Sequence, residues 1–232
     1  MGDVPPVAIC LVPWNSDHWT EHVLAQIAEH TQYPEWRVYI SDNSDEPYPK
    51  RGPRVDYWWN AANLGFAKAM NRALHICPED IVIVANCDLN LPDGWLTSLV
   101  EAYQSTDFGI IGPRMNVRVQ TVGLPVNGGV VEVDECPTSA LWITSKSRLY
   151  DRVGYYDEEL FPIGCADIYM PYLLWKAGGR VGIQTDVLVW HYCCGVAGAN
   201  VERDAYKDLV REARKKLRAK YGPEIDGGKP SA

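Results

Sequence analysis

Four consecutive aliphatic residues, Ile81-Val82-Ile83-Val84, constrain the fold of this chain more than any other segment. A short, β-branched run of this kind predicts a strand buried on both faces, as in the parallel sheet of an α/β protein. The run stops at Asn86-Cys87-Asp88. Ligands of open α/β sheets bind beyond the carboxyl ends of the strands, so Asp88 is a candidate ligand for a divalent cation that faces phosphate. The alternative is an aspartate that only ends the strand or caps the helix expected over Pro92–Tyr103.

Predicted strands and helices alternate through the first 110 residues or so. The expected strands are Val7–Val12, Arg37–Ser41, Val55–Trp59, Ile81–Ala85 and Gly109–Ile111, and the expected helices are Asp17–His30, Gly65–Ile76 and Trp95–Tyr103. This order favours an α/β fold with a mainly parallel central sheet and crossover helices that flank it.

The pattern becomes mixed after residue 115. We expect a hairpin or two antiparallel strands at Val117–Val122 and Val130–Val133, a strand at Leu141–Thr144, a loop at Gly154–Phe161, a helix at Ile168–Ala177 and extended chain over Val181–Tyr192. No linker or repeat divides the sequence. We therefore predict one domain over residues 1–221, with halves at about 7–115 and 116–200, a C-terminal helix at 201–221 and a flexible tail at 222–232.

Composition excludes several classes of protein. No apolar run reaches the length of a membrane span, and the first residues lack the pattern of a secretory leader, so we expect a cytoplasmic protein. The seven cysteines are odd in number and show no C-x-x-C spacing, which favours free thiols in a reducing compartment. Cys193 and Cys194 follow His191 closely, but no second ligand pair supports a zinc site.

Charge is distributed unevenly along the chain. The net charge of −8 argues against a general nucleic-acid binder. Residues 204–220 nevertheless hold seven Lys/Arg and three Asp/Glu, with apolar residues at helical spacing. The segment predicts an amphipathic helix that packs on its own domain, and its basic face is a candidate for peripheral contact with a membrane.

The common nucleotide-binding loops are missing. The first strand is followed by Pro13-Trp14-Asn15, so neither the dinucleotide-binding G-x-G-x-x-G nor a P-loop is present. A glycine-rich loop of the kind used by sugar-nucleotide pyrophosphorylases is also absent. If phosphates are bound, a cation at Asp88 is the better candidate for holding them.

Several short motifs together resemble the family 2 inverting glycosyltransferases of GT-A fold, in particular the branch of rhamnosyl- and galactofuranosyl-transferases. The resemblance covers about residues 7–195. The motifs are Pro13-Trp14-Asn15, Ser41-Asp42-Asn43-Ser44, Asn63-Leu64-Gly65-Phe66-Ala67, Asn86-Cys87-Asp88, Pro92-Asp93-Gly94-Trp95-Leu96, Ile111-Gly112-Pro113-Arg114, Ala140-Leu141-Trp142-Ile143, Val153-Gly154-Tyr155-Tyr156-Asp157-Glu158, Ala166-Asp167, Ala177-Gly178-Gly179-Arg180-Val181 and His191. Each motif alone is weak evidence, whereas their order and spacing together are specific.

The resemblance implies a donor site for a UDP- or dTDP-linked sugar in the first half and an acceptor site in the second. The residues that it assigns to the nucleotide-sugar are Pro13, Trp14, Asn15, Asp42, Asn63, Gly65, Asn86 and Asp88. Asp42 would accept a hydrogen bond from the imide of the base. The alternative for Asp42 is an Asx turn, and the Asn-Leu-Gly turn at Asn63 can be purely conformational.

The resemblance also implies a metal and a base. Asp88 and His191 would hold Mn²⁺ or Mg²⁺ against the diphosphate, although a histidine between Trp190 and Tyr192 can instead be a packing residue. Asp167 would be the general base that deprotonates the acceptor hydroxyl, or the N-cap of the following helix. The family usually has Glu-Asp where this chain has Ala166-Asp167.

The resemblance implies an acceptor that bears a hydroxyl group, for which we expect a glycan, a lipid-linked sugar or a protein. Two other functions remain open from the sequence. Ala166 and Tyr169 are consistent with an inert nucleotide-sugar or glycan binder of the same fold. The basic C-terminal helix is consistent with a scaffolding protein.

Overall fold

A computed structural model describes most of the chain. The described residues are 4–49, 52–116, 124–135, 137, 140–160, 165–193, 195–226 and 228–230. Within these ranges, no helix combines the length and the apolar character needed to cross a membrane.

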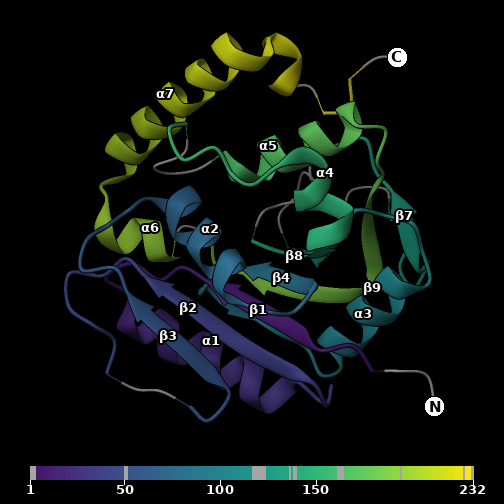
Figure 1. Cartoon of the computed structure of the whole chain (residues 1–232), viewed down its shortest axis with the longest axis horizontal. Helices are drawn as coiled ribbons and strands as arrows, with labels where there is room; N and C mark the ends of the chain where they lie inside the picture. The colour runs from purple at the N-terminus through teal and green to yellow at the C-terminus, as the bar shows by residue number, and fades with distance from the viewer. Residues whose placement is uncertain are drawn as a thin grey trace.

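A nine-stranded mixed sheet forms the centre of the molecule (Figure 1). Its strands are β1 (Val7–Leu11), β2 (Trp36–Asp42), β3 (Val55–Trp59), β4 (Ile81–Ala85), β5 (Leu89–Asn90), β6 (Ile110–Met115), β7 (Val130–Glu132), β8 (Leu141–Ser145) and β9 (Val181–His191). The order is β3-β2-β1-β4-β8-β6-β9-β5, and β7 pairs with β9. Strands β1 to β4 are mutually parallel, β6 is parallel to β9, and β8 runs antiparallel between β4 and β6.

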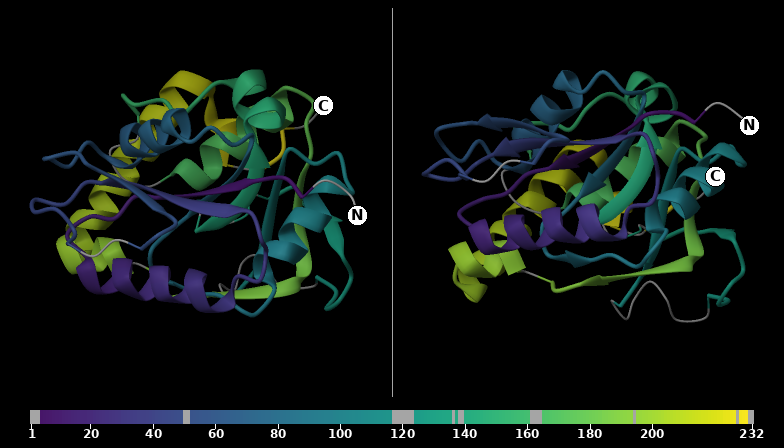
Figure 2. Two further views of the ribbon diagram at one scale, coloured as in Figure 1. Left: turned by 60° about the horizontal axis from the view of Figure 1, so that its bottom comes forward. Right: turned by 90° about the horizontal axis from the view of Figure 1, so that it is seen from below.

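Helices cover both faces of the sheet. They are α1 (Asp17–His30), α2 (Phe66–Ile76), α3 (Trp95–Gln104), α4 (Asp151–Val153), α5 (Ala166–Lys176), α6 (Gly195–Asn200) and α7 (Arg203–Tyr221), with a π-helical turn at Lys146–Tyr150 and a 3-10 turn at Pro223–Asp226. Figure 2 shows α1 on one side of the sheet and α2 and α7 on the other. This layering is that of an α/β protein with a mainly parallel central sheet, as predicted.

The side chains of β1 alternate between the two faces of the sheet, which explains why this strand is apolar throughout. Ala8 and Cys10 belong to the core that contains residues of α2, α5 and α7. Val7, Ile9 and Leu11 belong to the core that contains residues of α1 and α3. Because successive side chains of a strand point to opposite faces, a strand between two helical layers must be apolar at every position. The Ile81–Val84 run of β4 obeys the same rule.

Most predicted elements are confirmed to within a few residues, including α1, β3 and β4. Five short elements of the described chain were not predicted: β5, the π-helical turn, α4, α6 and the 3-10 turn at Pro223–Asp226. Part of the expected hairpin, Val117–Val122, lies outside the described residues. Its second strand is β7, which pairs antiparallel with β9.

The structure describes residues 222–226 and 228–230 of the segment 222–232, for which we expected a flexible tail. Pro223–Asp226 form a turn, and Ile225 is fully buried against the core beneath α7. The amide of Lys229 also donates a 2.7 Å hydrogen bond to the carbonyl of Asp134. A single apolar side chain at position 225 was too little for the sequence to indicate this packing.

Candidate active site at the carboxyl ends of the strands

Asp88 is buried between the end of β4 and the start of β5. The amide of Asn86 first donates to the carbonyl of Ala140, which holds the chain against β8 at 2.8 Å. The Asp88 side chain is 3% exposed. Its Oδ1 lies 3.3 Å from Nε2 of His191, and its Oδ2 accepts the amide of Gly195 at 2.9 Å. The structure thus brings the two predicted metal ligands together.

The charge of the Asp88 carboxylate is stabilised by these contacts. Burial by itself raises the pKa of Asp88, because it removes water from the charged form. Three contacts lower the pKa and outweigh burial: the hydrogen bond of His191, its charge, and the hydrogen bond from the amide of Gly195. The net pKa lies below the ordinary value, so Asp88 is ionised at neutral pH and is available as an oxygen ligand.

His191 ends β9 and is paired with Leu89 of β5. Two further hydrogen-bonding contacts join this end of β9 to the segment after β4. Asn86 places its amide nitrogen 3.4 Å from Nε2 of His191. The backbone of Asp88 also accepts a hydrogen bond from the amide of Tyr192 at 3.0 Å. Strand pairing therefore fixes both ends of the Asp88–His191 contact, although the two residues are far apart in the sequence.

The donor set of this pair fits a divalent cation only in part. A carboxylate oxygen and an imidazole nitrogen are both ligands that Mn²⁺ accepts, whereas Mg²⁺ prefers oxygen. Among the described residues, no group of three or more His, Cys, Asp and Glu side chains is arranged to hold a metal ion. A cation at Asp88 and His191 would need oxygens from a bound diphosphate or from water to complete its coordination.

Asp42 has a different environment from Asp88. It is fully buried at the end of β2. Oδ1 accepts the amide of Ser44 at 2.8 Å, which is the Asx turn considered above. Oδ2 accepts the Tyr57 hydroxyl at 2.6 Å and the amide of Tyr48 at 3.3 Å. Both carboxylate oxygens are therefore engaged within the protein, and no exposed part of the side chain faces a nucleobase.

The loop after β1 is tied to the loop after β2. Asn15 adopts a left-handed backbone conformation, with a φ of 41°. Its side chain donates to Asp45 at 2.9 Å and accepts the amide of Asp45 at 2.8 Å. The carbonyl of Pro13 accepts the amide of Asn43, and the carbonyl of Trp14 accepts the side-chain amide of Asn200 at 2.7 Å. These residues shape one edge of the site through their backbone.

Asn63 and Gly65 form the turn that precedes α2. The side-chain oxygen of Asn63 accepts the amide of Gly65 at 2.9 Å, and Gly65 has a φ of 80°. Asn43 joins this turn to β2, because its side chain donates to the carbonyl of Gly65 at 3.3 Å. The arrangement matches the conformational alternative for Asn63, whose side chain is exposed.

Asp167 is the second residue of α5. Its side chain lies outside the part of the chain that the structure describes. Tyr169, two residues further on, is 4% exposed and contacts α7, with its hydroxyl 3.3 Å from that of Tyr221. Burial and this contact raise the pKa of Tyr169, so the side chain is a neutral packing residue at physiological pH.

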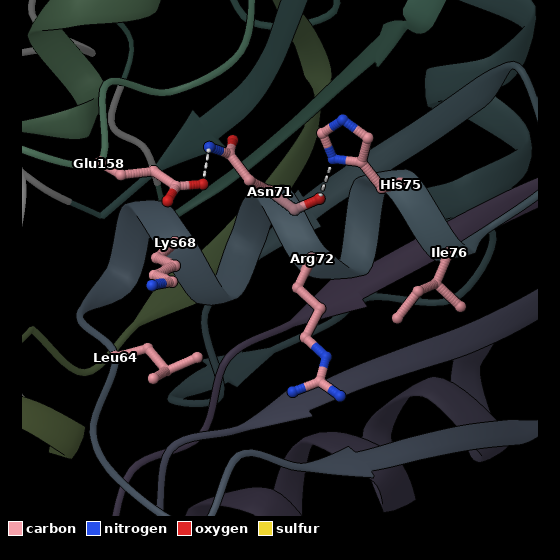
Figure 3. A pocket seen from close by; sticks show the side chains of 7 residues that line it. All are labelled: Leu64, Lys68, Asn71, Arg72, His75, Ile76 and Glu158. Atoms are coloured by element: carbon pink, nitrogen blue, oxygen red, sulfur yellow. Dashed lines mark hydrogen bonds between the residues drawn. The ribbon is translucent and has the colours of Figure 1, made fainter.

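An open groove of about 460 Å³ runs along α2 (Figure 3). It is lined by Leu64, Lys68, Asn71, Arg72, His75, Ile76 and Glu158. The amide of Asn71 donates to the Glu158 carboxylate at 3.0 Å and to the carbonyl of Tyr156 at 2.8 Å. The groove contains none of the predicted site residues, and its buried amide is satisfied by the protein itself.

Sequence reasoning missed Gly195, which closes the site at Asp88. A β-carbon at this position would lie 2.8 Å from Cβ of Asp88 and 2.8 Å from Cε2 of Trp19, closer than side chains tolerate. A glycine is therefore required for this approach. One glycine among 19 gave no sign of this role, because it depends on the packing of α6 against α1.

Comparison with known proteins adds a family and a fold. Residues 9–174 match the family described as "Glycosyl transferase family 2". No curated protein matches the chain. Among solved structures, the chain is similar to GalNAc-T7 with UDP, GalNAc and Mn²⁺, at 13% identity and a TM-score of 0.68, covering 81% of this chain and 43% of that one.

Two microbial structures are similar over nearly the whole chain. A mannosyltransferase from Pyrobaculum calidifontis, in complex with GDP-Man and Mn²⁺, has 17% identity and a TM-score of 0.66, covering 94% of this chain and 65% of that one. S. aureus TarS 1-349 with UDP-GlcNAc has 14% identity and a TM-score of 0.62, covering 95% and 70%. At these identities the likeness establishes the GT-A-type fold, and the chain spans less than half of GalNAc-T7.

Proposed function

Because the chain belongs to glycosyl transferase family 2, we propose that it transfers a sugar from a nucleoside-diphosphate sugar to an acceptor hydroxyl. The observation that carries this proposal is the contact of Asp88 with His191 at the carboxyl edge of the sheet. An ionised carboxylate beside an imidazole, held by two strands, is suited to a cation and a diphosphate.

Each residue of the pair has a separate task in the proposal. Asp88 contributes a carboxylate whose lowered pKa keeps it charged. His191 contributes Nε2 from the end of β9. A divalent cation bound there would neutralise the charge that develops on the departing diphosphate. Mn²⁺ is the better candidate than Mg²⁺, since one of the two protein ligands is nitrogen.

We assign the proton transfer to Asp167. The acceptor oxygen forms a bond to the anomeric carbon while the bond from that carbon to the diphosphate oxygen breaks. The hydroxyl proton passes to the Asp167 carboxylate, and attack from the face opposite the diphosphate inverts the anomeric centre. What supports this role is the resemblance at Ala166-Asp167, with Asp167 as the second residue of α5.

For the donor we propose a UDP- or dTDP-linked sugar, in line with the rhamnosyl- and galactofuranosyl-transferase branch. The base would lie against the loops of Trp14 and Asn63. Asp42 would hold the backbone of this pocket in place through its hydrogen bonds with the Ser44 amide, in the Asx turn, and with the Tyr57 hydroxyl. We propose that the acceptor is a glycan, a lipid-linked sugar or a protein.

The proposal is tested by incubating the protein with a panel of UDP-, dTDP- and GDP-sugars and measuring released nucleotide, with and without Mn²⁺. We expect turnover with one donor class, loss of turnover without the metal, and loss in Asp167→Asn protein that retains its fold. Binding of nucleotide without turnover for any donor and acceptor would instead identify an inert nucleotide-sugar binder. No binding at all would favour a scaffolding protein.

We further propose that the enzyme acts in the cytoplasm at an anionic membrane surface. The described cysteines Cys10, Cys77 and Cys87 are free thiols, as expected in a reducing compartment. Helix α7 buries only Ala213 and Leu217. Several of its basic side chains form a stripe along one side of the helix. At 3.6 residues per turn, they lie within roughly 80° of one another around the helix axis. The stripe consists of Arg203, Lys207, Arg211, Arg214 and Arg218.

Cosedimentation with lipid vesicles tests this placement. We expect binding to vesicles that contain phosphatidylglycerol, weaker binding at high salt, and little binding to pure phosphatidylcholine, because the attraction is electrostatic. Equal binding to both vesicle types, or none to either, would remove the membrane from the proposal.

A further inference from the structure

The side chain of Asn116 forms hydrogen bonds with the main chain of His191 in the way that a neighbouring strand would. The register of β6 with β9 ends at Met115 and Val189. Asn116, the residue that follows β6, supplies both a donor and an acceptor to the main chain of the partner strand. Its Oδ1 accepts the amide of His191 at 2.8 Å, and its Nδ2 donates to the carbonyl of His191 at 3.2 Å. The side chain thus continues the hydrogen bonding of the sheet for one more residue.

The ring of His191 has a partner at each nitrogen. Nε2 lies 3.3 Å from Oδ1 of Asp88, and Nδ1 lies 3.6 Å from Sγ of Cys193. A thiol can both donate and accept a hydrogen bond, although weakly. It can therefore donate to Nδ1 when Nε2 carries the proton and accept from Nδ1 when Nε2 must offer its lone pair.

We propose that Asn116 and Cys193 are positioning residues for the His191 imidazole. Asn116 fixes the main chain from which the ring projects, and Cys193 holds Nδ1 so that Nε2 faces Asp88. The inference rests on the proposed function, because it concerns the same cation site. Partners of this kind commonly hold metal-binding histidines, and their loss typically costs about 10–100-fold in metal affinity.

This role differs from ordinary packing at both positions. Cys193 is exposed, so burial does not explain its contact with the ring. Asn116 is half-buried and directs both of its polar atoms to the main chain of one residue, His191. Leu89 of β5 pairs with His191 as well. The metal-binding end of β9 is therefore held by β5 and by Asn116.

The first experiment measures Mn²⁺ binding in the presence of UDP, from the free-ion signal in electron paramagnetic resonance. Asn116→Ala and Cys193→Ala should each weaken Mn²⁺ binding about tenfold or more. Cys193→Ser should restore most of the affinity, because a hydroxyl also donates and accepts. Gln104→Ala, which removes an exposed carboxamide at the end of α3, is the matched control and should bind Mn²⁺ as the wild type does.

The second experiment records the ¹⁵N chemical shifts of the imidazole nitrogens in the metal-free protein. In Cys193→Ala the tautomer ratio of His191 should change, whereas a merely structural cysteine would leave it unaltered. This measurement keeps the inference testable if Asn116→Ala fails to fold, because Cys193 is exposed and its truncation leaves no cavity.

Asp88→Asn separates this inference from the proposed function. If Asp88→Asn binds Mn²⁺ as tightly as the wild type, the cation site itself is wrong. If Asp88→Asn loses Mn²⁺ while Asn116→Ala and Cys193→Ala both retain full affinity and an unchanged tautomer ratio, the site stands and the positioning roles are overturned.

Discussion

Asp42 and Asp88 occupy equivalent places in the fold but have different partners. Asp42 is the last residue of β2 and Asp88 follows β4, both strands of the parallel part of the sheet, and each is buried. The Asp42 carboxylate is saturated by Ser44, Tyr48 and Tyr57, all within 15 residues of it. The Asp88 carboxylate is held by groups more than 100 residues away.

The difference teaches that a strand-end position does not by itself define a ligand-binding carboxylate. The hydrogen bonds of Asp42 to its own loop and to Tyr57 of β3 order this region and leave neither carboxylate oxygen available for a ligand. A contact between an aspartate and a titratable histidine from a distant strand can exchange for a cation, since both groups are metal ligands. We therefore expect substitutions at Asp42 to change stability and substitutions at Asp88 to change chemistry.

Asp88→Asn gives the largest expected effect and tests one side of this comparison. The amide keeps the shape of the side chain and loses the charge, so turnover of the nucleotide-sugar should fall about 100- to 1000-fold, as when one group that stabilises a transition state is removed. Steady-state turnover and thermal unfolding would be measured together. Unchanged turnover in Asp88→Asn would show that Asp88, like Asp42, has only a structural role.

Asp42→Ala tests the other side. Truncation leaves the amides of Ser44 and Tyr48 and the hydroxyl of Tyr57 without their acceptor, so the free energy of unfolding should fall by roughly 3 kcal/mol. Urea denaturation measures it. Tyr57→Phe is the milder variant and should cost about 1 kcal/mol. A stable Asp42→Ala protein that no longer binds UDP would show instead that Asp42 contacts the base.

Gly195→Ala tests the packing around Asp88 and leaves the surroundings of Asp42 unchanged. The added methyl group would meet the Asp88 side chain and Trp19 at less than 3.0 Å, so α6 must move away from the site. Crowding of this kind typically costs about 1–3 kcal/mol. We expect a lower unfolding midpoint together with faster hydrogen exchange at the amide of residue 195. Ala197→Gly, in the same helix, is a control that adds no crowding.

The smallest expected effect is a pH dependence specific to Asp88. Its pKa in the folded state is lowered, because the contacts with His191 and Gly195 outweigh the effect of burial. A lowered folded pKa adds stability that is present above the unfolded value, near pH 4, and is lost as the pH falls through the folded value. The stability advantage of the wild type over Asp88→Asn should therefore shrink below about pH 4 in thermal unfolding. An advantage that grows with acidity would contradict the assigned direction.

Local sequence patterns were sufficient for most of the fold. The run Ile81–Val84 predicted β4 as a strand buried on both faces, and the alternation of strands and helices predicted the layers on either side. Short elements without periodicity, such as β5 and α6, escaped prediction because two to six residues carry too little pattern.

The candidate site was predicted less completely. The motif order singled out Asp88 and His191, which the structure places in contact. It assigned Asp42 to the nucleobase, which stays a prediction; in the structure that carboxylate accepts hydrogen bonds from Ser44 of its own loop and Tyr57 of β3. It gave no indication of Asn116 or Gly195, because a lone asparagine or glycine has no pattern until a distant segment packs against it.

The sequence by itself determined the α/β layering, because the period of apolar residues along the chain decides which elements can bury both faces or only one. It also supplied the ionisable groups at the ends of β4 and β9. Only the tertiary structure decided which of them act together. Strand order brings His191 to Asp88 across about 100 residues of chain, and the free energy of a buried charge depends on the partners that packing provides.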